Sequence, residues 1–523
     1  MANIIIFTNR TPSNFETNGE LYQIQRYNRP AGAYKIASTL QKHGYSVIVV
    51  PDCLSLTFEG VKQIISNNSD GLLWAGISTT FAYVRSSNIN EYRKLWQTSH
   101  EQFINLDILN INFSSHDNVT QLAWADLELG MLSNYLKNTH QAKLIIGGTW
   151  ITQIKDGALG NTDDNIHFVT GLAEDYTVEL TNSLANKQTI PFQRTSVEEK
   201  EFKSSIIDYR ETDFIEPDDW LMLEVSRGCA FKCAYCVYDH KGKADTTKHV
   251  KTLRDELIRN YELWGVTKYH LVDDLYNDSD HKVKLLYDEL WSKLPFTPEW
   301  VSYLRLDLIW STPDQAQWIE ASGCKIGCFG IETLHDVAGR KVGKGLGKER
   351  ILETLEHLKN LWGDRVIVNA LMIAGLPYEP YDHIVETMNW LHTTDLVHSY
   401  KYNALWITPP DHKKFVLKQN DMSQDYEKYE LTWGPDGWIN NVGVTFKMVN
   451  ELVTNDDKWI YNHHFPVDLH EYTDLRSVGG YTHEQLASKD FNKYLLANVA
   501  EYVERLNSRI HDRLIKMINL KNQ

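Results

Sequence analysis

Three of the six cysteines stand close together in the spacing Cys-x3-Cys-x2-Cys. They are Cys229, Cys233 and Cys236, in the segment LEVSRGCAFKCAYC. Three thiolates on one loop can bind three irons of a [4Fe–4S] cubane and leave the fourth iron open to a chelating ligand. A zinc site and inert buried thiols are the alternatives, but zinc usually takes four ligands, and the nearby fourth candidate is His240. The spacing therefore favours an iron–sulfur cluster.

The other three cysteines are scattered along the chain. Cys324 and Cys328 lie four residues apart on one face of a predicted strand, and Cys53 follows another predicted strand. Buried free cysteines behave as small apolar side chains, so we expect all three to pack in the interior. Six cysteines in a chain of 523 residues are also too few for a disulfide framework.

The cysteine triad follows the first of six apolar runs that alternate with helical stretches. The runs are 221–225, 269–273, 300–306, 325–331, 366–373 and 400–407, and the helical stretches include 249–263, 280–293 and 348–361. This alternation predicts parallel strands joined by helices, and six units instead of eight predict an open, partial barrel. Sites in such barrels assemble at the carboxyl ends of the strands, where the triad is expected.

Residues 1–190 contain an earlier series of strands and helices. The strands are expected at 3–7, 46–50, 71–78, 143–146 and 166–170, and the helices at 32–43, 91–106 and 121–137. The pattern is typical of a doubly wound parallel sheet. A Gly-x-Gly-x-x-Gly fingerprint is missing, which argues against a dinucleotide in this sheet.

The chain is therefore predicted to be an α/β protein with three parts. Residues 1–190 form the doubly wound domain, 191–218 a linker without a sustained period, and 219–415 the partial (βα)6 barrel. Residues 416–523 begin with loops rich in Trp and Tyr and form a mostly helical C-terminal region, with a last helix at 491–518.

Composition narrows the class of partner. Lys and Arg total 53 against 69 Asp and Glu, which leaves a net charge of −16 and argues against a broad phosphate-binding surface. No apolar stretch is long enough to span a bilayer. The N-terminus MANIIIFTNR opens into a strand pattern without a basic region or cleavage site. We expect a cytoplasmic protein without a membrane partner, although a local basic groove would be compatible with this charge balance.

Over roughly residues 220–410 the chain resembles the radical SAM superfamily, whose signature is this cysteine spacing after the first barrel strand. The resemblance implies that the open iron binds the amino and carboxylate groups of S-adenosylmethionine (SAM). One electron, from a donor such as flavodoxin or ferredoxin, then cleaves the sulfonium and yields a 5′-deoxyadenosyl radical. The cofactors supply this chemistry, and the protein positions the groups and excludes water.

The resemblance extends to residues beside the triad and at the ends of later strands. It implies Tyr235 beside the adenine, Asp273 and Asp274 at the methionine amino group, Arg305 at the methionine carboxylate, Glu332 at the ribose hydroxyls and Gly375 in the adenine wall. Charge agrees for the acidic pair, because a carboxylate suits an ammonium. The alternative is that the Asp, Arg and Glu residues at the strand ends are solvated loop residues or salt-bridge partners.

Residues 1–190 resemble the Rossmann-like cobalamin-binding domain that precedes the barrel in one large radical SAM class. The residues that carry this match, and that it implies as cofactor contacts, are Gly32, Ser78, Gly147, Gly148 and Gly171. The chain departs from the family motif at the cobalt-ligating His, where it has Arg29, and at the Asp, where it has Tyr27. The resemblance thus implies cobalamin without an imidazole ligand from this motif, and the alternative is a domain that only packs on the barrel.

The leading hypothesis is a cobalamin-dependent radical SAM methyltransferase that acts on an unactivated carbon. The alternatives are a radical SAM enzyme that does not use cobalamin, or uses it for rearrangement or cyclisation, and a non-catalytic protein with a structural cluster or zinc. A methylthiotransferase-type tRNA modifier would carry a second cysteine trio and a basic module, which this sequence lacks. A small molecule or a peptide is favoured over a nucleic acid as substrate, although no residue identifies it.

Overall fold

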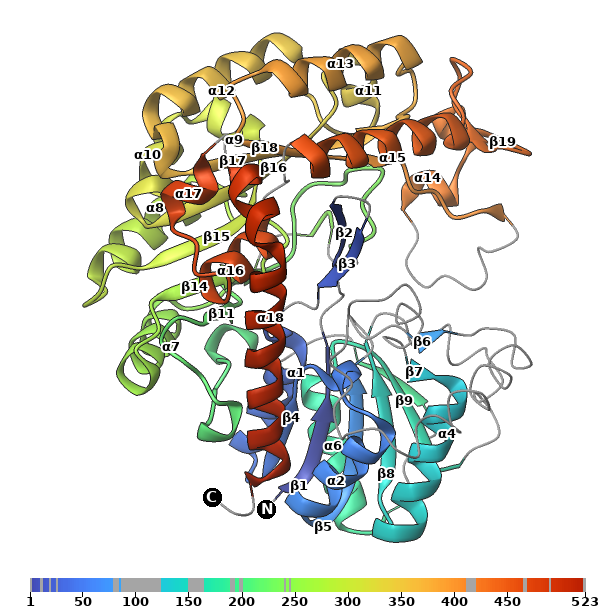
Figure 1. Ribbon diagram of the computed structural model, residues 1–523, viewed down its shortest axis with the longest axis vertical. Helices are drawn as coiled ribbons and strands as arrows, with labels where there is room; N and C mark the ends of the chain where they lie inside the picture. The colour runs from blue at the N-terminus through green and yellow to red at the C-terminus, as the bar shows by residue number, and fades with distance from the viewer. Residues whose placement is uncertain are drawn as a thin grey trace. The chain divides into compact units, whose positions relative to one another are not determined.

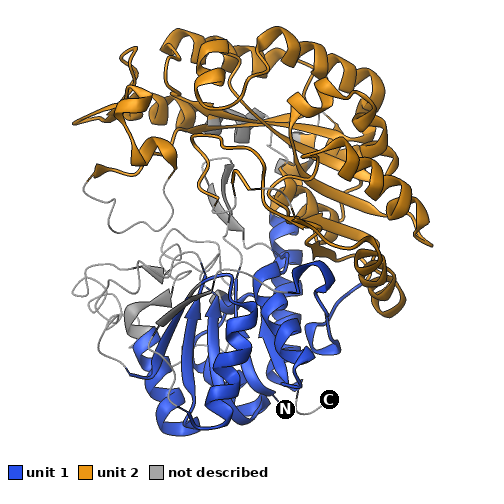
Figure 2. Cartoon of the chain, turned by 180° about the vertical axis from the view of Figure 1, so that it is seen from behind, with its two compact units in different colours: residues 1–15, 20–216, 500–523 blue, residues 16–19, 217–499 orange. Residues whose placement is uncertain are grey.

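The computed structural model describes most of the chain, in two compact units (Figure 2). The described residues are 2–9, 13–17, 20–24, 27–78, 84–85, 124–148, 164–188, 193–196, 201–238, 241–243, 246–410, 420–463, 468–488 and 491–520. The first unit comprises 1–15, 20–216 and 500–523, and the second comprises 16–19 and 217–499. The last helix, α18 (Phe491–Ile518), begins in the second unit and continues in the first. Within the described residues, no helix is long and apolar enough to cross a membrane.

A six-stranded parallel sheet forms the core of the first unit, in the order β10-β9-β8-β5-β1-β4. Side chains of the central strands, such as Ile4, Ala75 and Leu144, are fully buried. The first strand lies inside the sheet, with the second on one side and the later strands on the other, which is a doubly wound order. The strands are β1 (Ala2–Phe7), β4 (Val47–Val50), β5 (Ser69–Ser78), β8 (Lys143–Gly147), β9 (Ile166–Gly171) and β10 (Gln193–Ser196).

Amphipathic helices complete the first unit. In α1, Tyr34, Ala37 and Leu40 recur at helical spacing and are buried, and this helix packs against α6. The helices are α1 (Ala31–Lys42), α2 (Phe58–Asn68), α4 (Asp126–Tyr135) with a π-helical extension at Leu136–His140, and α6 (Glu174–Ala185); the short strands β2 (Ser13–Thr17), β3 (Glu20–Ile24), β6 (Val84–Arg85) and β7 (Trp124–Ala125) pair two by two. All five predicted strands are confirmed, and the helix predicted at 91–106 lies outside the described residues.

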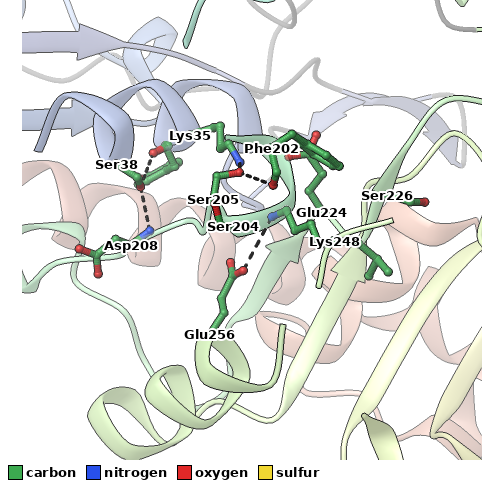
Figure 3. A network of polar contacts seen from close by, with 12 residues as sticks. Lys35, Ser38, Phe202, Ser204, Ser205, Asp208, Glu224, Ser226, Lys248 and Glu256 are labelled. Atoms are coloured by element: carbon green, nitrogen blue, oxygen red, sulfur yellow. Dashed lines mark hydrogen bonds and ion pairs between the residues drawn. The ribbon is translucent and has the colours of Figure 1, made fainter. Parts of the chain in front are cut away.

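The segment predicted as a linker has structure of its own. Its start pairs in parallel with β9 as β10, and 3₁₀ helices follow at Phe202–Ser204 and Glu211–Asp213. Figure 3 shows α1 bonded to this segment: Lys35 Nζ contacts the Ser205 hydroxyl, and the amide of Asp208 donates to Ser38 Oγ at 2.8 Å. Residues up to 216 therefore belong to the first unit.

The second unit is built on another parallel sheet, in the order β11-β14-β15-β16-β17-β18 (Figure 1). The order follows the chain, and β11 and β18 form the two edges, so the sheet is open. The strands are β11 (Trp220–Leu223), β14 (Lys268–Leu271), β15 (Glu299–Leu304), β16 (Cys324–Glu332), β17 (Ile367–Ala374) and β18 (Ser399–Ala404). The six predicted strands are thus confirmed, as is the α/β class.

Helices join these strands and fill the C-terminal region. Gly265, at φ +69°, ends α7 in the left-handed conformation, and Ser279 Oγ caps α8 by accepting from the amide of Lys282. The helices between strands are α7 (Val250–Trp264), α8 (Asp280–Glu289), α9 (Leu306–Ser311), α10 (Asp314–Ala321), α11 (Asp336–Lys341), α12 (Lys348–Trp362) and α13 (Tyr381–Thr393). After them come α14 (Asp421–Gln424), the hairpin β19 (Thr432–Gly434) and β20 (Gly437–Ile439), α15 (Phe446–His463), α16 (Leu469–Ser477), α17 (His483–Ala487) and α18.

Candidate functional site

The cysteine loop leaves the carboxyl end of β11 through a glycine turn. Gly228 has φ +106°, a conformation that glycine adopts without strain. Cys233 is buried, whereas Cys229 and Cys236 are half-buried. A turn brings the last two together, because the amide of Cys236 donates to the carbonyl of Cys233 at 3.1 Å. The three thiols thus share one short loop at the end of the sheet where the sequence places the site.

Neighbouring segments hold this loop from two sides. The amide of Ala234 donates to the carbonyl of Val342 at 3.0 Å, and the amide of Gly242 donates to the carbonyl of Phe231 at 2.8 Å. Next to Val342, Gly343 has φ +88°, and a Cβ there would lie 3.5 Å from the Cα of Cys233. The backbone of the loop is therefore fixed by contacts that do not involve the thiols.

A guanidinium faces the buried thiol. Arg305 follows β15, and its Nη1 lies 3.4 Å from Cys233 Sγ. Its other nitrogens donate to both carboxylate oxygens of Asp307 at 2.9 and 2.6 Å, and its Cζ lies 3.7 Å from the centre of the Phe231 ring. Burial acts to raise the pKa of Asp307, but the hydrogen bonds and charge of Arg305 outweigh it and the pKa is lowered. The result is a fixed positive group beside Cys233.

The half-buried thiols are not ionised by the protein alone. Burial raises the pKa of Cys229 and of Cys236, and the nearness of the other thiols adds to it. Thiols become iron ligands as thiolates, so cluster assembly at this loop releases protons. In the part of the chain that the structure describes, no three His, Cys, Asp or Glu side chains gather around one metal-ion position. Thiolates of a cubane each bind a different iron, and three thiols on one loop beside a guanidinium fit that arrangement.

Asp273 and Asp274 follow β14 and differ in their surroundings. Asp273 is buried, and its Oδ1 accepts from the amides of Val225 and Ser226, each at 2.8 Å, so it fixes the entry to the cysteine loop. Asp274 is half-buried, and its charge is one of the causes that raise the pKa of Cys229. The structure brings both aspartates to the loop, and their contact with a methionine amino group stays a prediction.

Glu332 stands at a bulge at the end of β16. The register with β17 shifts between Gly330 and Glu332, and Glu332 has φ +71°, which is rare for a residue with a side chain. The hydroxyl of Tyr235 donates to Glu332 Oε1 at 2.7 Å, and Lys344 Nζ lies 3.6 Å from the same oxygen. Burial, followed by the Glu332 charge, raises the pKa of Tyr235 strongly. Two predicted site residues are therefore directly bonded.

An open pocket of about 390 Å³ adjoins these groups at the ends of β15 and β16. Asp307, Lys344 and Thr333 are among its lining residues. The pocket therefore borders the partners of both Arg305 and Glu332, at the carboxyl edge of the sheet.

Gly375, after β17, is a glycine for steric reasons. Its φ is +90°, and a Cβ would lie 2.2 Å from Cη2 of Trp438. That indole is buried and is held by a hydrogen bond from its Nε1 to the carbonyl of Leu405 at 2.9 Å. The predicted adenine wall is thus a backbone segment that packs on an aromatic ring.

Replacing Gly375 with Ala is expected to destabilise the protein by about 2–4 kcal/mol, because it combines backbone strain with overpacking. The matched control is Gly345→Ala, since a Cβ at Gly345 meets no atom within 4 Å and the backbone there is unstrained. Thermal unfolding should separate the two variants, with only Gly375→Ala lowering Tm. Equal Tm values for Gly375→Ala and Gly345→Ala would contradict this, because they would mean that the Trp438 ring moves aside at no measurable cost.

Glu379 supports the same segment from within the interior. It is fully buried, its Oε1 accepts from the Thr333 hydroxyl, and its Oε2 accepts from the amide of Gly375 at 3.3 Å. It therefore ties the end of β16 to the end of β17. Burial raises its pKa to about 7, although these hydrogen bonds act in the opposite direction.

Replacing Glu379 with Gln is expected to flatten the pH dependence of stability. The pKa of Glu379 in the folded protein, about 7, lies above its ordinary value of 4.5. Between these two pH values the folded state therefore binds a proton that the unfolded state has lost. The stabilising contribution of this group is complete below pH 4.5 and is lost as the pH rises through 7. Between about pH 5 and about pH 8, the free energy of unfolding of the wild type should fall by up to about 3 kcal/mol relative to that of Glu379→Gln. Thermal unfolding over this range should show the Tm of the wild type falling relative to that of the variant. Parallel profiles would contradict this.

Four of the five N-terminal residues named from the sequence lie at one edge of the first unit's sheet. Ser78 ends β5 and pairs in register with Gly147 at the end of β8. Gly148 and Gly171 have φ +104° and +81°, and Gly171 ends β9. Gly32 lies in the first turn of α1, where a Cβ would meet nothing within 4 Å. Four of the five thus lie at the carboxyl edge of neighbouring strands, where open α/β sheets bind ligands.

Arg29, at the position of the family's cobalt ligand, points into the protein. It is buried, and its Nη2 donates to the carbonyls of Asp213 and Phe214 at 3.0 and 3.1 Å. Burial raises the pKa of Asp213 to about 6, although the hydrogen bond from the Arg210 amide and the Arg29 charge act to lower it. The guanidinium therefore has a structural task in the first unit.

A second buried arginine lies beside it. Arg513, on α18, donates through Nε and Nη2 to Asp52 Oδ2 at 3.0 and 2.5 Å, and its guanidinium lies 4.2 Å from the centre of the Tyr27 ring. On α2, Asn68 bonds to the carbonyl of Met517 at 2.8 Å. These contacts explain why the end of α18 belongs to the first unit.

Sequence reasoning missed three residues that shape the site: Asp307, Glu379 and Lys241. Asp307 and Glu379 stand two and four residues beyond strand-end residues that were singled out, so spacing offered a signal for them. Lys241 lies five residues after the last cysteine of the triad, but its contacts depend on the return of the loop, which sequence does not reveal.

Comparison with known proteins defines the class of the second unit. Residues 223–391 match the family model described as the Radical SAM superfamily, so this part of the chain is a radical SAM domain. No curated protein matches the sequence.

Solved structures resemble the chain far beyond that domain. The radical S-adenosylmethionine methyltransferase TsrM from Kitasatospora setae, with cobalamin and a [4Fe–4S] cluster bound, is 14% identical with a TM-score of 0.59, over 95% of this chain and 100% of that chain. The structure of the same enzyme with tryptophan substrate and a SAM analogue bound is 13% identical with a TM-score of 0.60, over 96% of this chain and 99% of that chain. The cobalamin-dependent S-adenosylmethionine radical enzyme OxsB with aqua-cobalamin bound is 13% identical with a TM-score of 0.52, over 100% of this chain and 84% of that chain. At these identities the likeness establishes a shared fold.

Proposed function

We propose that the protein is a cobalamin-dependent radical SAM enzyme that reductively cleaves SAM and methylates an unactivated carbon. The observation that carries the proposal is the cysteine loop itself: three thiols in the family spacing, with Arg305 against Cys233, at the carboxyl edge of a radical SAM domain. The likeness in fold over 95% of this chain to a methyltransferase with cobalamin and a cluster bound supports the rest.

Cys229, Cys233 and Cys236 would hold the cluster. When bound, the cluster would supply one electron to the sulfonium of SAM, and the corrinoid would carry the methyl group. Arg305 offsets negative charge at Cys233, and Asp307 keeps the guanidinium in place. A flavodoxin or ferredoxin is the proposed electron donor.

The residues around the loop would orient SAM. Asp274 lies close enough to Cys229 for its charge to raise the pKa of that thiol. A carboxylate in this position would bind the ammonium group of the methionine part of SAM. Glu332 would accept from the ribose hydroxyls, and Tyr235 and Lys344 hold its carboxylate for that task. Asp273 fixes the loop entry and Gly375 offers backbone to the adenine, while Arg305 would face the methionine carboxylate.

Ser78, Gly147, Gly148 and Gly171 would receive the corrinoid at the carboxyl edge of the first unit's sheet. Gly32, in the first turn of α1, is the fifth residue that the resemblance implies as a contact. Small residues there let a ligand approach the backbone closely. Arg29 would supply no imidazole, and its Nη2 is engaged with backbone carbonyls.

Anaerobic incubation with hydroxocobalamin, followed by desalting, tests the corrinoid part. About one equivalent should remain with the protein and show a corrinoid spectrum. The matched variants are Gly147→Val, which places a side chain at the proposed site, and Gly345→Ala in the second unit, where a Cβ meets no atom within 4 Å and the backbone is unstrained. If the wild type and both variants lose the corrinoid equally on desalting, the proposal of corrinoid binding is wrong, whereas the assignment of the radical SAM domain is unaffected.

The rival keeps the radical step but uses it for rearrangement or cyclisation. OxsB, which shares the fold, is described by its cofactors without a methyl-transfer product. Methyl transfer predicts S-adenosylhomocysteine together with 5′-deoxyadenosine in the presence of substrate. Formation of 5′-deoxyadenosine alone would favour the rival.

A further inference from the structure

One lysine touches the backbone of all three cysteines of the triad. The backbone of Lys241 forms an isolated parallel bridge with Cys229. Its Nζ donates to the carbonyl of Cys236 at 2.7 Å and lies 3.5 Å from the carbonyl of Cys233. The side chain is 18% exposed, so its charge is largely shielded from water. An ammonium therefore lies against the backbone carbonyls of the cysteine loop.

A carboxylate from a distant part of the second unit neutralises this ammonium. Asp421, the first residue of α14, places Oδ1 2.7 Å from Lys241 Nζ. The next amide, that of Met422, donates to the carbonyl of Ala234 between two of the cysteines at 3.4 Å. The C-terminal region thus contacts the cysteine loop through one charge and one backbone bond.

We propose that Lys241 and Asp421 form a charge pair that sets the reduction potential of the cluster, which rests on the function proposed above. Reduction adds one electron to the cluster, taken from an external reductant that is oxidised in turn. A cation close to the cluster stabilises the added negative charge, and an anion opposes it. Lys241 acts on the cluster ligands directly, and Asp421 acts through Lys241, so both are positioning and tuning residues.

The pair makes two predictions of opposite sign, which a purely structural role does not. Lys241→Met removes the cation, so the reduced-to-oxidised ratio at a fixed solution potential should fall about tenfold. Asp421→Asn leaves the cation without its partner, so the ratio should rise by about threefold. The effect is smaller because the Asp421 side chain is more exposed to water than that of Lys241, 36% against 18%. The double variant should return towards the wild type, because the two charges are removed together.

The experiment is a redox titration of the reconstituted full-length protein, followed by EPR of the reduced cluster. Lys243→Met is the matched control, because it removes the same charge from the same loop at an exposed side chain. Lys241→Arg keeps the charge and should stay close to the wild type. Iron and sulfide contents are measured first in every variant, and Asp421→Asn keeps the test decisive if Lys241→Met fails to assemble a cluster.

The outcomes separate the inference from the function on which it rests. Opposite shifts for Lys241→Met and Asp421→Asn, with Lys243→Met unchanged, support the charge pair. Unchanged potentials, or shifts in the same direction, overturn the inference while the loaded cluster leaves the proposed function standing. A wild type that assembles no cluster overturns the proposed function, and the inference with it.

Discussion

Replacing Cys233 with Ala is expected to abolish cluster assembly. The iron content after anaerobic reconstitution should fall from about four per chain to less than about one, and the charge-transfer absorbance of the cluster should disappear. The reason is geometric as well as chemical: Cys233 is the buried member of the triad and the one that Arg305 faces. Removing it deprives one iron of its ligand and leaves the guanidinium without the sulfur that it contacts.

The chain carries its own matched control in Cys324→Ala. Cys324 is buried in β16, and its Sγ contacts the carbonyl of Ile326 at 3.6 Å, inside the same unit. Burial raises its pKa, so the thiol stays protonated and packs as an apolar group. Cys324→Ala should retain a full complement of iron. Equal iron contents in the two variants would contradict the assignment of the triad.

Replacing Arg513 with Met is expected to be among the most destabilising changes in the first unit. Arg513 and Asp52 are 3% and 2% exposed, and removal of one partner leaves an uncompensated buried charge. The expected loss is about 3–5 kcal/mol, which corresponds to a fall in Tm of roughly 10 °C. Calorimetry is the suitable measurement, because a protein with two units need not unfold in one step.

The control and the double variant make this prediction specific. Asp512→Asn changes an exposed charge next to Arg513 and should leave Tm within about 1–2 °C of the wild type. Arg513→Met combined with Asp52→Asn removes both charges and should recover part of the loss. If the double variant loses more stability than the two single variants together, the result would contradict the ion-pair account.

The strands of both sheets were predictable because buried parallel strands appear as apolar runs. β1 (ANIIIF) and β4 (VIVV) are almost wholly buried, and such runs stand out from any helical period. β10 (QRTS) was missed because it is a short polar strand at the edge of its sheet. α15 was missed although Val449 and Val453 lie four apart and are buried, because Asn and Asp residues interrupt the period.

The residue types of the site were predictable, but their pairings were not. The spacing of the triad and the strand-end positions of Arg305 and Glu332 could be read locally. That Arg305 binds Asp307 and faces Cys233, or that Tyr235 bonds to Glu332, depends on loops that meet only in the fold. Arg29 shows the same limit, since its partners are carbonyls 184 and 185 residues away.

The central claim is that the loop of Cys229, Cys233 and Cys236 holds a cluster that cleaves SAM. The most direct measurement is 5′-deoxyadenosine formed by the anaerobically reconstituted protein from SAM and dithionite, beside Cys233→Ala and Cys324→Ala. The account predicts 5′-deoxyadenosine from the wild type and from Cys324→Ala, and none above background from Cys233→Ala. A wild type that carries a full cluster yet forms no 5′-deoxyadenosine would contradict it.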